Sequence, residues 1–108
     1  MKDDLVYLRH IVDAIKDIEA YTVGGSDEFF ATKMVQDAVI RNLEIIGEAV
    51  KNLSPSFRGK HPEVPWKQIA GLRDVLIHHY FGVDIGSIWL VVESRLPGLL
   101  QRLETLLT

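Results

Sequence analysis

Apolar residues recur at the spacing of a helix through most of this chain, and this periodicity constrains its fold more than any other feature. Near the N-terminus, for example, Leu8, Ile11, Val12 and Ile15 fall on one face of a helix. No segment shows the strict alternation of apolar and polar residues that is typical of a half-exposed strand. The pattern therefore predicts an all-α bundle, mostly up and down, with helices at about residues 3 or 4 to 21, 28 to 53, 65 to 79 and 85 to 106.

Glycine and proline residues mark the places where these helices end. The stretch TVGGSDE interrupts the apolar pattern after residue 21, and Ser26 or Asp27 is the expected N-cap of the second helix. Three of the four prolines lie in SPSFRGKHPEVP, which we expect to be a long irregular connection. Asp84 is the expected cap of the last helix, and Pro97 should kink that helix.

Two glycines, Gly47 and Gly71, lie inside predicted helices, where each costs about 1 kcal/mol relative to alanine. A close crossing of two helices would justify that cost. We therefore expect the second and third helices to approach each other at these two glycines. A polar row of the second helix would then face the third helix, and it consists of Asp37, Arg41, Glu44 and Glu48.

The size and composition of the chain restrict the class of protein. With 108 residues it is expected to be a single domain, residues 1–108, whose modest core a second subunit would help to bury. There is no apolar N-terminal signal, no run of membrane-spanning length and no cysteine, which indicates a soluble, cytoplasmic protein without a membrane partner. The net charge of −3 combines −5 over residues 1–50 with +3 over residues 51–80. This excludes a protein that coats nucleic acid broadly and leaves room for a local phosphate site.

The stretch GLRDVLIHHYFGVD, residues 71–84, places Arg73, His78 and Tyr80 in an otherwise apolar helix. At about 100° per residue, Arg73 and Tyr80 fall on nearly the same face, whereas His78 points about 140° away from Arg73. Two arrangements would still let Arg73 and His78 act together. The helix could unwind near His78, or two chains could meet across a two-fold axis and share one cleft.

Arginine and histidine are the side chains that RNA cleavage without a metal requires. Histidine can take the proton of the 2′-hydroxyl near neutral pH, and a guanidinium can bind two oxygens of the charged transition state. Asp74 and His78 are four residues apart and could instead bind a metal on one helix face, but no third ligand lies close by in the sequence. We therefore expect no metal site, and Asp74 could orient the histidine.

The motif Arg73-x4-His78-x-Tyr80 resembles the R-x4-H-x-Y motif of the HepT toxins, within the HEPN (higher eukaryotes and prokaryotes nucleotide-binding) superfamily. The stretches QDAVIRNLEIIGEAVKNL, PWKQIAGLRDVLIHHYFGVD and IWLVVESRLPGLL also resemble that family, so the resemblance covers nearly the whole chain. It implies an antiparallel four- to five-helix, HEPN-like bundle that forms a homodimer with both motifs in one cleft.

For function, the resemblance implies a metal-independent endoribonuclease without a cofactor, the toxin of a type VII toxin–antitoxin pair. Arg73 and His78 would be its catalytic pair, acting on RNA and not on DNA. The cognate antitoxin would be a minimal nucleotidyltransferase that transfers AMP to Tyr80 and so silences the enzyme. The alternative is a non-catalytic helical HEPN module that binds a nucleotidyltransferase, which the acidic N-terminal half of the chain favours.

Glu44 and Glu48 are the candidate partners of Arg73, because a buried arginine needs a carboxylate; otherwise these glutamates form a solvated helix face. The two tryptophans are expected in the core or at a dimer contact. No catalytic constellation includes the remaining histidine and tryptophan side chains, which are His10, His61, His79, Trp66 and Trp89.

Overall fold

The computed structural model describes residues 3–78 and 84–108, and of His78 only its place in a helix. The described residues are helical with no strand, so the predicted all-α fold class is confirmed. The predicted features at residues 79–83, including Tyr80, lie outside the described residues. In chain order the elements are α1 (Asp4–Tyr21), α2 (Gly25–Ala31), α3 (Lys33–Asn52), α4 (Pro55–Lys60), α5 (Trp66–His78), α6 (Ile85–Leu90), the π-helical η2 (Val91–Arg95) and α7 (Leu96–Leu107).

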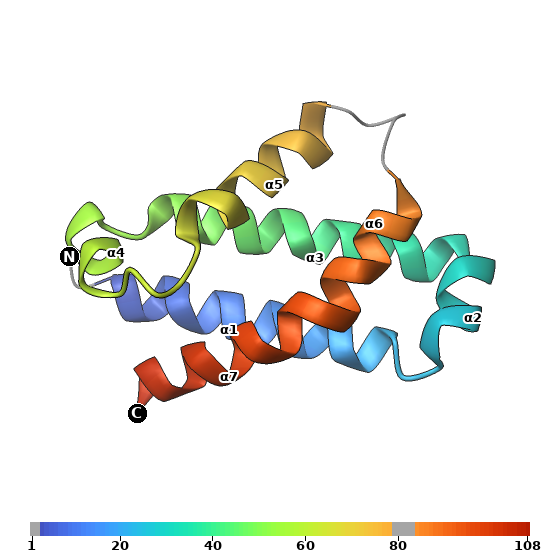
Figure 1. Ribbon diagram of the computed structural model, residues 1–108, viewed down its shortest axis with the longest axis horizontal. Helices are drawn as coiled ribbons and strands as arrows, with labels where there is room; N and C mark the ends of the chain where they lie inside the picture. The colour runs from blue at the N-terminus through green and yellow to red at the C-terminus, as the bar shows by residue number, and fades with distance from the viewer. Residues whose placement is uncertain (1–2, 79–83) are drawn as a thin grey trace.

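Helix α3 lies at the centre of the bundle. It packs against α1 and against α5, which lie on either side of it, and α7 packs against α1 (Figure 1). No helix within residues 3–78 and 84–108 combines the length and the apolar character needed to cross a membrane. The side chains without exposed surface come from α1, α2, α3 and α7 and include Leu8, Ile11, Ile15, Ile18, Phe29, Val39, Val50 and Leu103.

The predicted second helix, residues 28–53, is in fact two helices. The backbone is extended at Thr32, with φ −124° and ψ 102°, and this residue separates α2 from α3. The amide of Gln36 donates hydrogen bonds to the main-chain carbonyls of Phe29 (3.0 Å) and Phe30 (3.2 Å), which satisfies acceptors at the end of α2. Phe29 is fully buried, and its ring lies 5.1 Å from that of Trp89 on α6. Burying Phe29 in the core therefore stabilises the protein more than the continuous helix that the local pattern predicted.

The start of α2 also differs from the prediction. The helix begins at Gly25, whose φ of +83° lies in the left-handed region that favours glycine, and no side chain caps it. Ser26 and Asp27 therefore lie inside the first turn, so the prediction of an N-cap at either residue was wrong. Asp27 still stabilises the helix start there, because a negative charge interacts favourably with the N-terminal end of the helix dipole.

The proline-rich connection contains a short helix, so the expectation of irregular structure was wrong here. Pro55 occupies the first turn of α4, where a missing N–H costs no helical hydrogen bond. The hydroxyl of Ser54 accepts a hydrogen bond from the N–H of Phe57 (3.0 Å) and donates one to Asp4 (2.7 Å). The start of α4 is thereby tied to the start of α1, a contact that local sequence patterns do not reveal.

Both tryptophans are packing residues, as expected. Trp66, the first residue of α5, is buried, and its indole N–H donates a hydrogen bond to the main-chain carbonyl of His61 (2.9 Å). Trp89 is half-buried and packs its ring against Phe29 and, at 6.4 Å, Phe30. Neither indole ring is presented as an open platform for stacking a base.

The last helical segment confirms the predicted cap at Asp84. Asp84 caps α6, since its carboxylate accepts hydrogen bonds from the Gly86 N–H and the Ser87 hydroxyl, each at 2.9 Å. The hydrogen bond from the Ser87 side chain, with those from the main-chain N–H groups of Gly86 and Ser87, lowers the pKa of Asp84. The π-helical turn η2 divides the predicted last helix and ends two residues before Pro97, and the kink expected at Pro97 stays a prediction.

Candidate active site

Arg73 lies where α5 comes closest to α3. A Cβ atom at Gly47 would clash with the Cβ of Arg73 and would lie 3.3 Å from its Cα, so any side chain there would push α5 away. The predicted close crossing is therefore confirmed at Gly47. It was wrong at Gly71, where a Cβ atom would have no neighbour within 4 Å. The backbone of α3 meets α5 at the arginine itself and not at the second glycine.

An ion pair holds the guanidinium of Arg73 against α3. Its Nε lies 3.0 Å from Oε1 of Glu48, and its Nη1 lies 3.6 Å from Oδ1 of Asp74, the next residue of α5. The Arg73 side chain is only 26% exposed, so this pair is partly shielded from solvent. The predicted contact between Arg73 and a carboxylate of α3 is thus confirmed for Glu48. Glu44 pairs instead with Arg41, at 3.8 Å.

Asp74 joins the two helices on the outer side of the crossing. The Nζ of Lys51 on α3 donates a hydrogen bond to Oδ1 of Asp74 at 2.6 Å. Asp74 therefore helps to fix the position of α5 on α3. Its suggested role in orienting His78 concerns a side chain outside the described structure and stays a prediction.

Arg73 lines a polar cleft of about 240 Å³ between α1, α3 and α5. Most of the lining comes from one face of α3, with α1 and α5 on either side (Figure 1). The two arginines and two glutamates that line the cleft balance each other in charge. The full lining is Tyr7 and His10 from α1, Arg41, Glu44, Ile45, Glu48, Ala49 and Asn52 from α3, and Arg73 and Ile77 from α5.

Two residues of this cleft, Tyr7 and His10, were not assigned to any site from the sequence. They lie one turn apart on α1 and make an edge-to-face contact, with ring centroids 6.0 Å apart and ring planes at 89°. Tyr7 is half-buried and His10 is exposed. Their spacing of three residues places them on one helix face, which the sequence could have shown. Only the packing of α1 on α3 shows that this face looks onto the cleft that contains Arg73.

The α-helical backbone of α5 continues through His78. The described part of the helix therefore lacks the unwinding that would bring position 78 round toward position 73. The two positions stay about 140° apart around the helix axis. Of the two arrangements predicted for Arg73 and His78, this backbone is compatible with the one in which two chains share a cleft. Tyr80 lies beyond the described end of α5.

The cleft can hold a phosphate group through Arg73. Glu48 engages the guanidinium at Nε, and the other N–H groups of the same side chain can bond oxygens of an anion. Because the glutamates of the cleft offset its arginines, an incoming phosphate must compete with carboxylates. The cleft therefore offers a positioned cation rather than an excess of positive charge.

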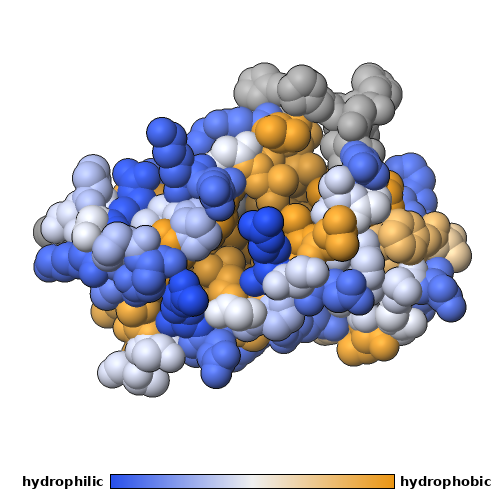
Figure 2. All heavy atoms as spheres, in the orientation of Figure 1, coloured by the Kyte–Doolittle hydropathy of each residue, from blue (hydrophilic) through white to orange (hydrophobic). Residues whose placement is uncertain are grey.

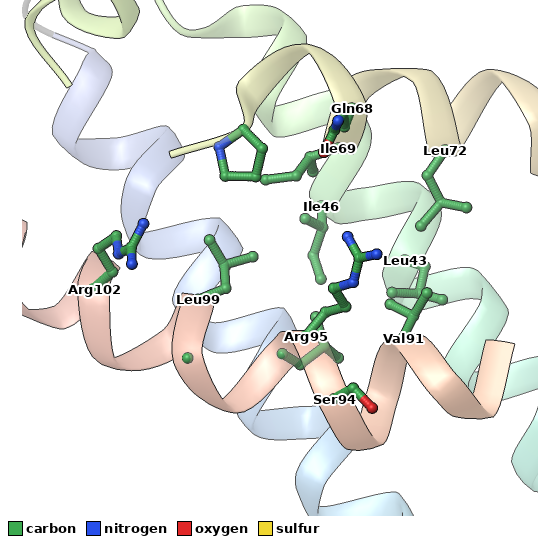
Figure 3. Close-up of a pocket in the computed structure, with 13 residues that line it drawn as sticks. Leu43, Ile46, Gln68, Ile69, Leu72, Val91, Ser94, Arg95, Leu99 and Arg102 are labelled. Carbon is green, nitrogen blue, oxygen red and sulfur yellow. The ribbon is translucent and has the colours of Figure 1, made fainter. Parts of the chain in front are cut away.

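A second cavity, of about 290 Å³, lies against α3 between α5 and the run from η2 to α7 (Figure 3). Its lining is mainly apolar, and apolar surface gathers between α5 and the α6–α7 run (Figure 2). Arg95 points into this cavity, and Arg102 at its edge donates a hydrogen bond to the main-chain carbonyl of Glu63 at 2.7 Å. The described lining contains no histidine or carboxylate, so this cavity lacks the side chains best suited to proton transfer near neutral pH.

The all-helical architecture of the described residues is consistent with a HEPN-like helical fold. The sequence model of the family described as "Ribonuclease HepT-like" matches residues 11–106. The chain therefore belongs to the HepT-like ribonuclease family, and the predicted family is confirmed.

Three relatives extend this result. "Probable ribonuclease HepT" of Thermococcus cleftensis is 46% identical over 101 residues, which cover 93% of this chain and 92% of that protein. A "Putative RNase" of Methanocaldococcus jannaschii is 47% identical over 107 residues, 98% of this chain and 88% of that protein. In "Gamma-glutamylcyclotransferase and putative RNase" of the same organism, 103 residues are 50% identical. They cover 94% of this chain and 46% of that protein, so the chain spans about half of its length. No solved structure matches the chain.

Replacing Gly47 by alanine should destabilise the helix crossing. We expect Gly47→Ala to lower the free energy of unfolding by roughly 1–3 kcal/mol, because the new methyl group meets the Cβ and Cα of Arg73. Gly71→Ala is the matched control, since it adds the same methyl group inside α5 where space is open. It should leave stability unchanged or raise it by up to about 1 kcal/mol. Urea unfolding followed by circular dichroism measures both, and equal effects of the two substitutions would contradict the crossing described here.

Proposed function

We propose that this protein is a metal-independent endoribonuclease, the toxin of a type VII toxin–antitoxin pair, with Arg73 and His78 as its catalytic pair. The observation that carries the proposal is the position of Arg73. Gly47 lets the arginine approach α3, Glu48 holds its guanidinium, and the side chain lines a polar cleft. Membership of the HepT-like ribonuclease family and the names of the relatives support RNA as the substrate.

In the proposed reaction His78 takes the proton of a ribose 2′-hydroxyl, and the 2′-oxygen attacks the adjacent phosphorus. Negative charge then accumulates on the non-bridging oxygens, where Arg73 stabilises it. The bond from phosphorus to the 5′-oxygen breaks, its electron pair stays on that oxygen, and the oxygen takes up a proton. The products carry a 2′,3′-cyclic phosphate and a 5′-hydroxyl, and no step needs a metal ion or a cofactor.

The proposal includes a homodimer in which the motifs of two chains share one cleft. Positions 73 and 78 lie about 140° apart on one helix, so Arg73 of one chain would act with His78 of the other across a two-fold axis. Val75 of α5, which is 51% exposed, offers apolar surface for such a contact.

Silencing by a nucleotidyltransferase antitoxin would act on Tyr80, two positions after His78. Transfer of AMP to the phenol oxygen places a phosphate and a nucleoside beside the catalytic pair. The new phosphate would compete with RNA for Arg73, and the nucleoside would fill the space that the substrate needs.

A second candidate function is a non-catalytic HEPN module that binds the nucleotidyltransferase. The balanced charge of the cleft favours it, because phosphate groups of RNA gain little from a cleft without excess positive charge. The two candidates differ in whether the purified protein cuts RNA.

Purified protein should cleave RNA in the presence of EDTA and leave 2′,3′-cyclic phosphate ends. We expect Arg73→Ala and His78→Ala each to reduce cleavage by at least about 10²-fold, because one loses charge stabilisation and the other the base. His61→Ala is the control, since that imidazole packs 4.8 Å from the ring of Phe57 and does not line the cleft. Gel analysis of labelled RNA with mass spectrometry of the ends measures this. A need for added metal, or full activity of His78→Ala, would exclude the mechanism, and no cleavage by unmodified protein would favour the binding module.

The shared cleft can be tested by mixing two inactive variants. Arg73→Ala and His78→Ala chains, unfolded and refolded together, should regain roughly a quarter of the wild-type activity, because half of the dimers are mixed and each mixed dimer has one intact site. Each variant refolded alone is the control. If Arg73 and His78 of the same chain acted together, no mixture would be active, and that result would remove the composite site.

Tyr80→Phe should retain much of the ribonuclease activity and escape silencing. Incubation with ATP, magnesium and the nucleotidyltransferase encoded beside this protein should add the mass of AMP to wild-type protein and not to Tyr80→Phe. Tyr21→Phe, at the distant end of α1, is the matched control and should still gain AMP. Intact-mass spectrometry is the readout, and a mass gain on Tyr80→Phe would show that another residue is the acceptor.

A further inference from the structure

The cleft that contains Arg73 also contains a histidine that the R-x4-H-x-Y motif does not include. His10 reaches the cleft from α1, on the opposite side of α3 from α5 (Figure 1). Its imidazole is exposed and therefore accessible to a substrate, and its edge-to-face contact with Tyr7 restrains the ring. An accessible, restrained histidine thus lines the same 240 Å³ space as the arginine.

Cleavage of RNA by its own 2′-hydroxyl requires two proton transfers, and the catalytic pair of the motif supplies one of them. The base removes the proton of the 2′-hydroxyl. The 5′-oxygen then leaves as a strongly basic alkoxide unless an acid protonates it, and general acid catalysis of such a step is worth about 10²- to 10⁴-fold in rate. The proposed reaction therefore lacks a group that donates a proton to the leaving oxygen.

The other polar groups of the cleft are poorly suited to this donation. Arginine does not release a proton in proteins, which excludes Arg41 and Arg73. Glu44 and Glu48 pair with these two arginines, so their carboxylates serve as hydrogen-bond acceptors for guanidinium groups and not as donors to a substrate.

Histidine is the side chain that is both protonated to a useful extent and able to donate near neutral pH. Asn52 also lines the cleft, but an amide releases no proton, and a phenol such as that of Tyr7 is a weaker acid than an imidazolium. Among the described lining residues, His10 is therefore the best suited.

We propose that His10 is the general acid of the reaction, a role that rests on the proposed ribonuclease function. As the 2′-oxygen bonds to phosphorus, the bond from phosphorus to the 5′-oxygen breaks and its electron pair stays on that oxygen. The imidazolium of His10 delivers its proton there and becomes neutral, while the base that took the 2′-hydroxyl proton becomes charged. The products are the 2′,3′-cyclic phosphate and the 5′-hydroxyl, with no other reactant consumed. His10 acts from the same chain as Arg73, because both line one cleft within a single chain.

A substrate with a better leaving group tests this role directly. In an oligoribonucleotide with sulfur in place of the 5′-bridging oxygen, the leaving thiolate needs no acid. His10→Ala and His10→Gln should cut the normal oligoribonucleotide about 10²- to 10⁴-fold more slowly than wild type and cut the sulfur analogue within about threefold of wild type. His61→Ala, which removes a histidine outside the cleft, should match wild type on both substrates.

The pH dependence gives a second readout. Activity of the wild type on the normal substrate should fall at high pH, where the acid has lost its proton, and His10→Gln should lose this fall. The comparison of wild type with His10→Gln keeps the other titratable and charged groups of the cleft unchanged. These groups are Tyr7 from α1, Arg41, Glu44 and Glu48 from α3, and Arg73 from α5.

The outcomes separate this inference from the function on which it rests. Equal losses of activity on the oxygen and sulfur substrates would show that His10 only binds the substrate or stabilises the fold. Unchanged activity of both His10 variants would show that His10 has no role in cleavage. Either result overturns the inference and leaves the ribonuclease function intact. A wild-type protein that cuts neither substrate would overturn both. Circular dichroism and thermal unfolding of each variant confirm that the exposed position tolerates the change.

Discussion

The approach of α5 to the backbone of α3 at Gly47 determines the position of Arg73 in the cleft. A glycine inside a helix costs about 1 kcal/mol, and here it removes the one atom that would keep Arg73 away from α3. At this separation the guanidinium reaches Glu48 one residue further along α3. The bond between Lys51 and Asp74 adds a second tie between the two helices at the next turn. The arginine is therefore held by its backbone and by its charge partner together.

The charge balance of the cleft has a consequence for catalysis. A phosphodiester carries one negative charge, whereas the transition state of its cleavage carries close to two. Under the proposed function, Arg73 would interact more strongly with the more highly charged transition state than with the substrate, while Glu48 offsets part of its charge in both states. Under the proposed function, such a cleft would bind RNA less tightly than a cleft with excess positive charge, which agrees with a chain whose net charge is −3 and whose N-terminal half is acidic. In a cleft with balanced charge, stabilisation of the transition state would depend more on the precise position of Arg73 than on the number of basic residues.

Local patterns in the sequence determined the helical class, the course of α1 and α5, and the cap at Asp84. These features depend on residues within a few positions of each other, through the 3.6-residue period of a helix and the hydrogen bonds at its ends. The motif from Arg73 to Tyr80 likewise indicated the family from residues along one segment. A contact between Arg73 and Glu44 or Glu48 was predictable because a buried arginine needs a carboxylate and the expected helix crossing placed the polar row of α3 beside α5; the structure selects Glu48.

The tertiary structure alone decided which distant segments meet. It breaks the second predicted helix at Thr32, where burying Phe29 in the core is worth more than one unbroken helix. It selects Gly47 and not Gly71 as the point of contact, and it brings His10 of α1 into the cleft of Arg73. Local periodicity shows which face of each helix is apolar or polar but not which faces oppose each other. That choice depends on how all the helices bury their apolar surface at once, a property of the assembled core that no single segment contains.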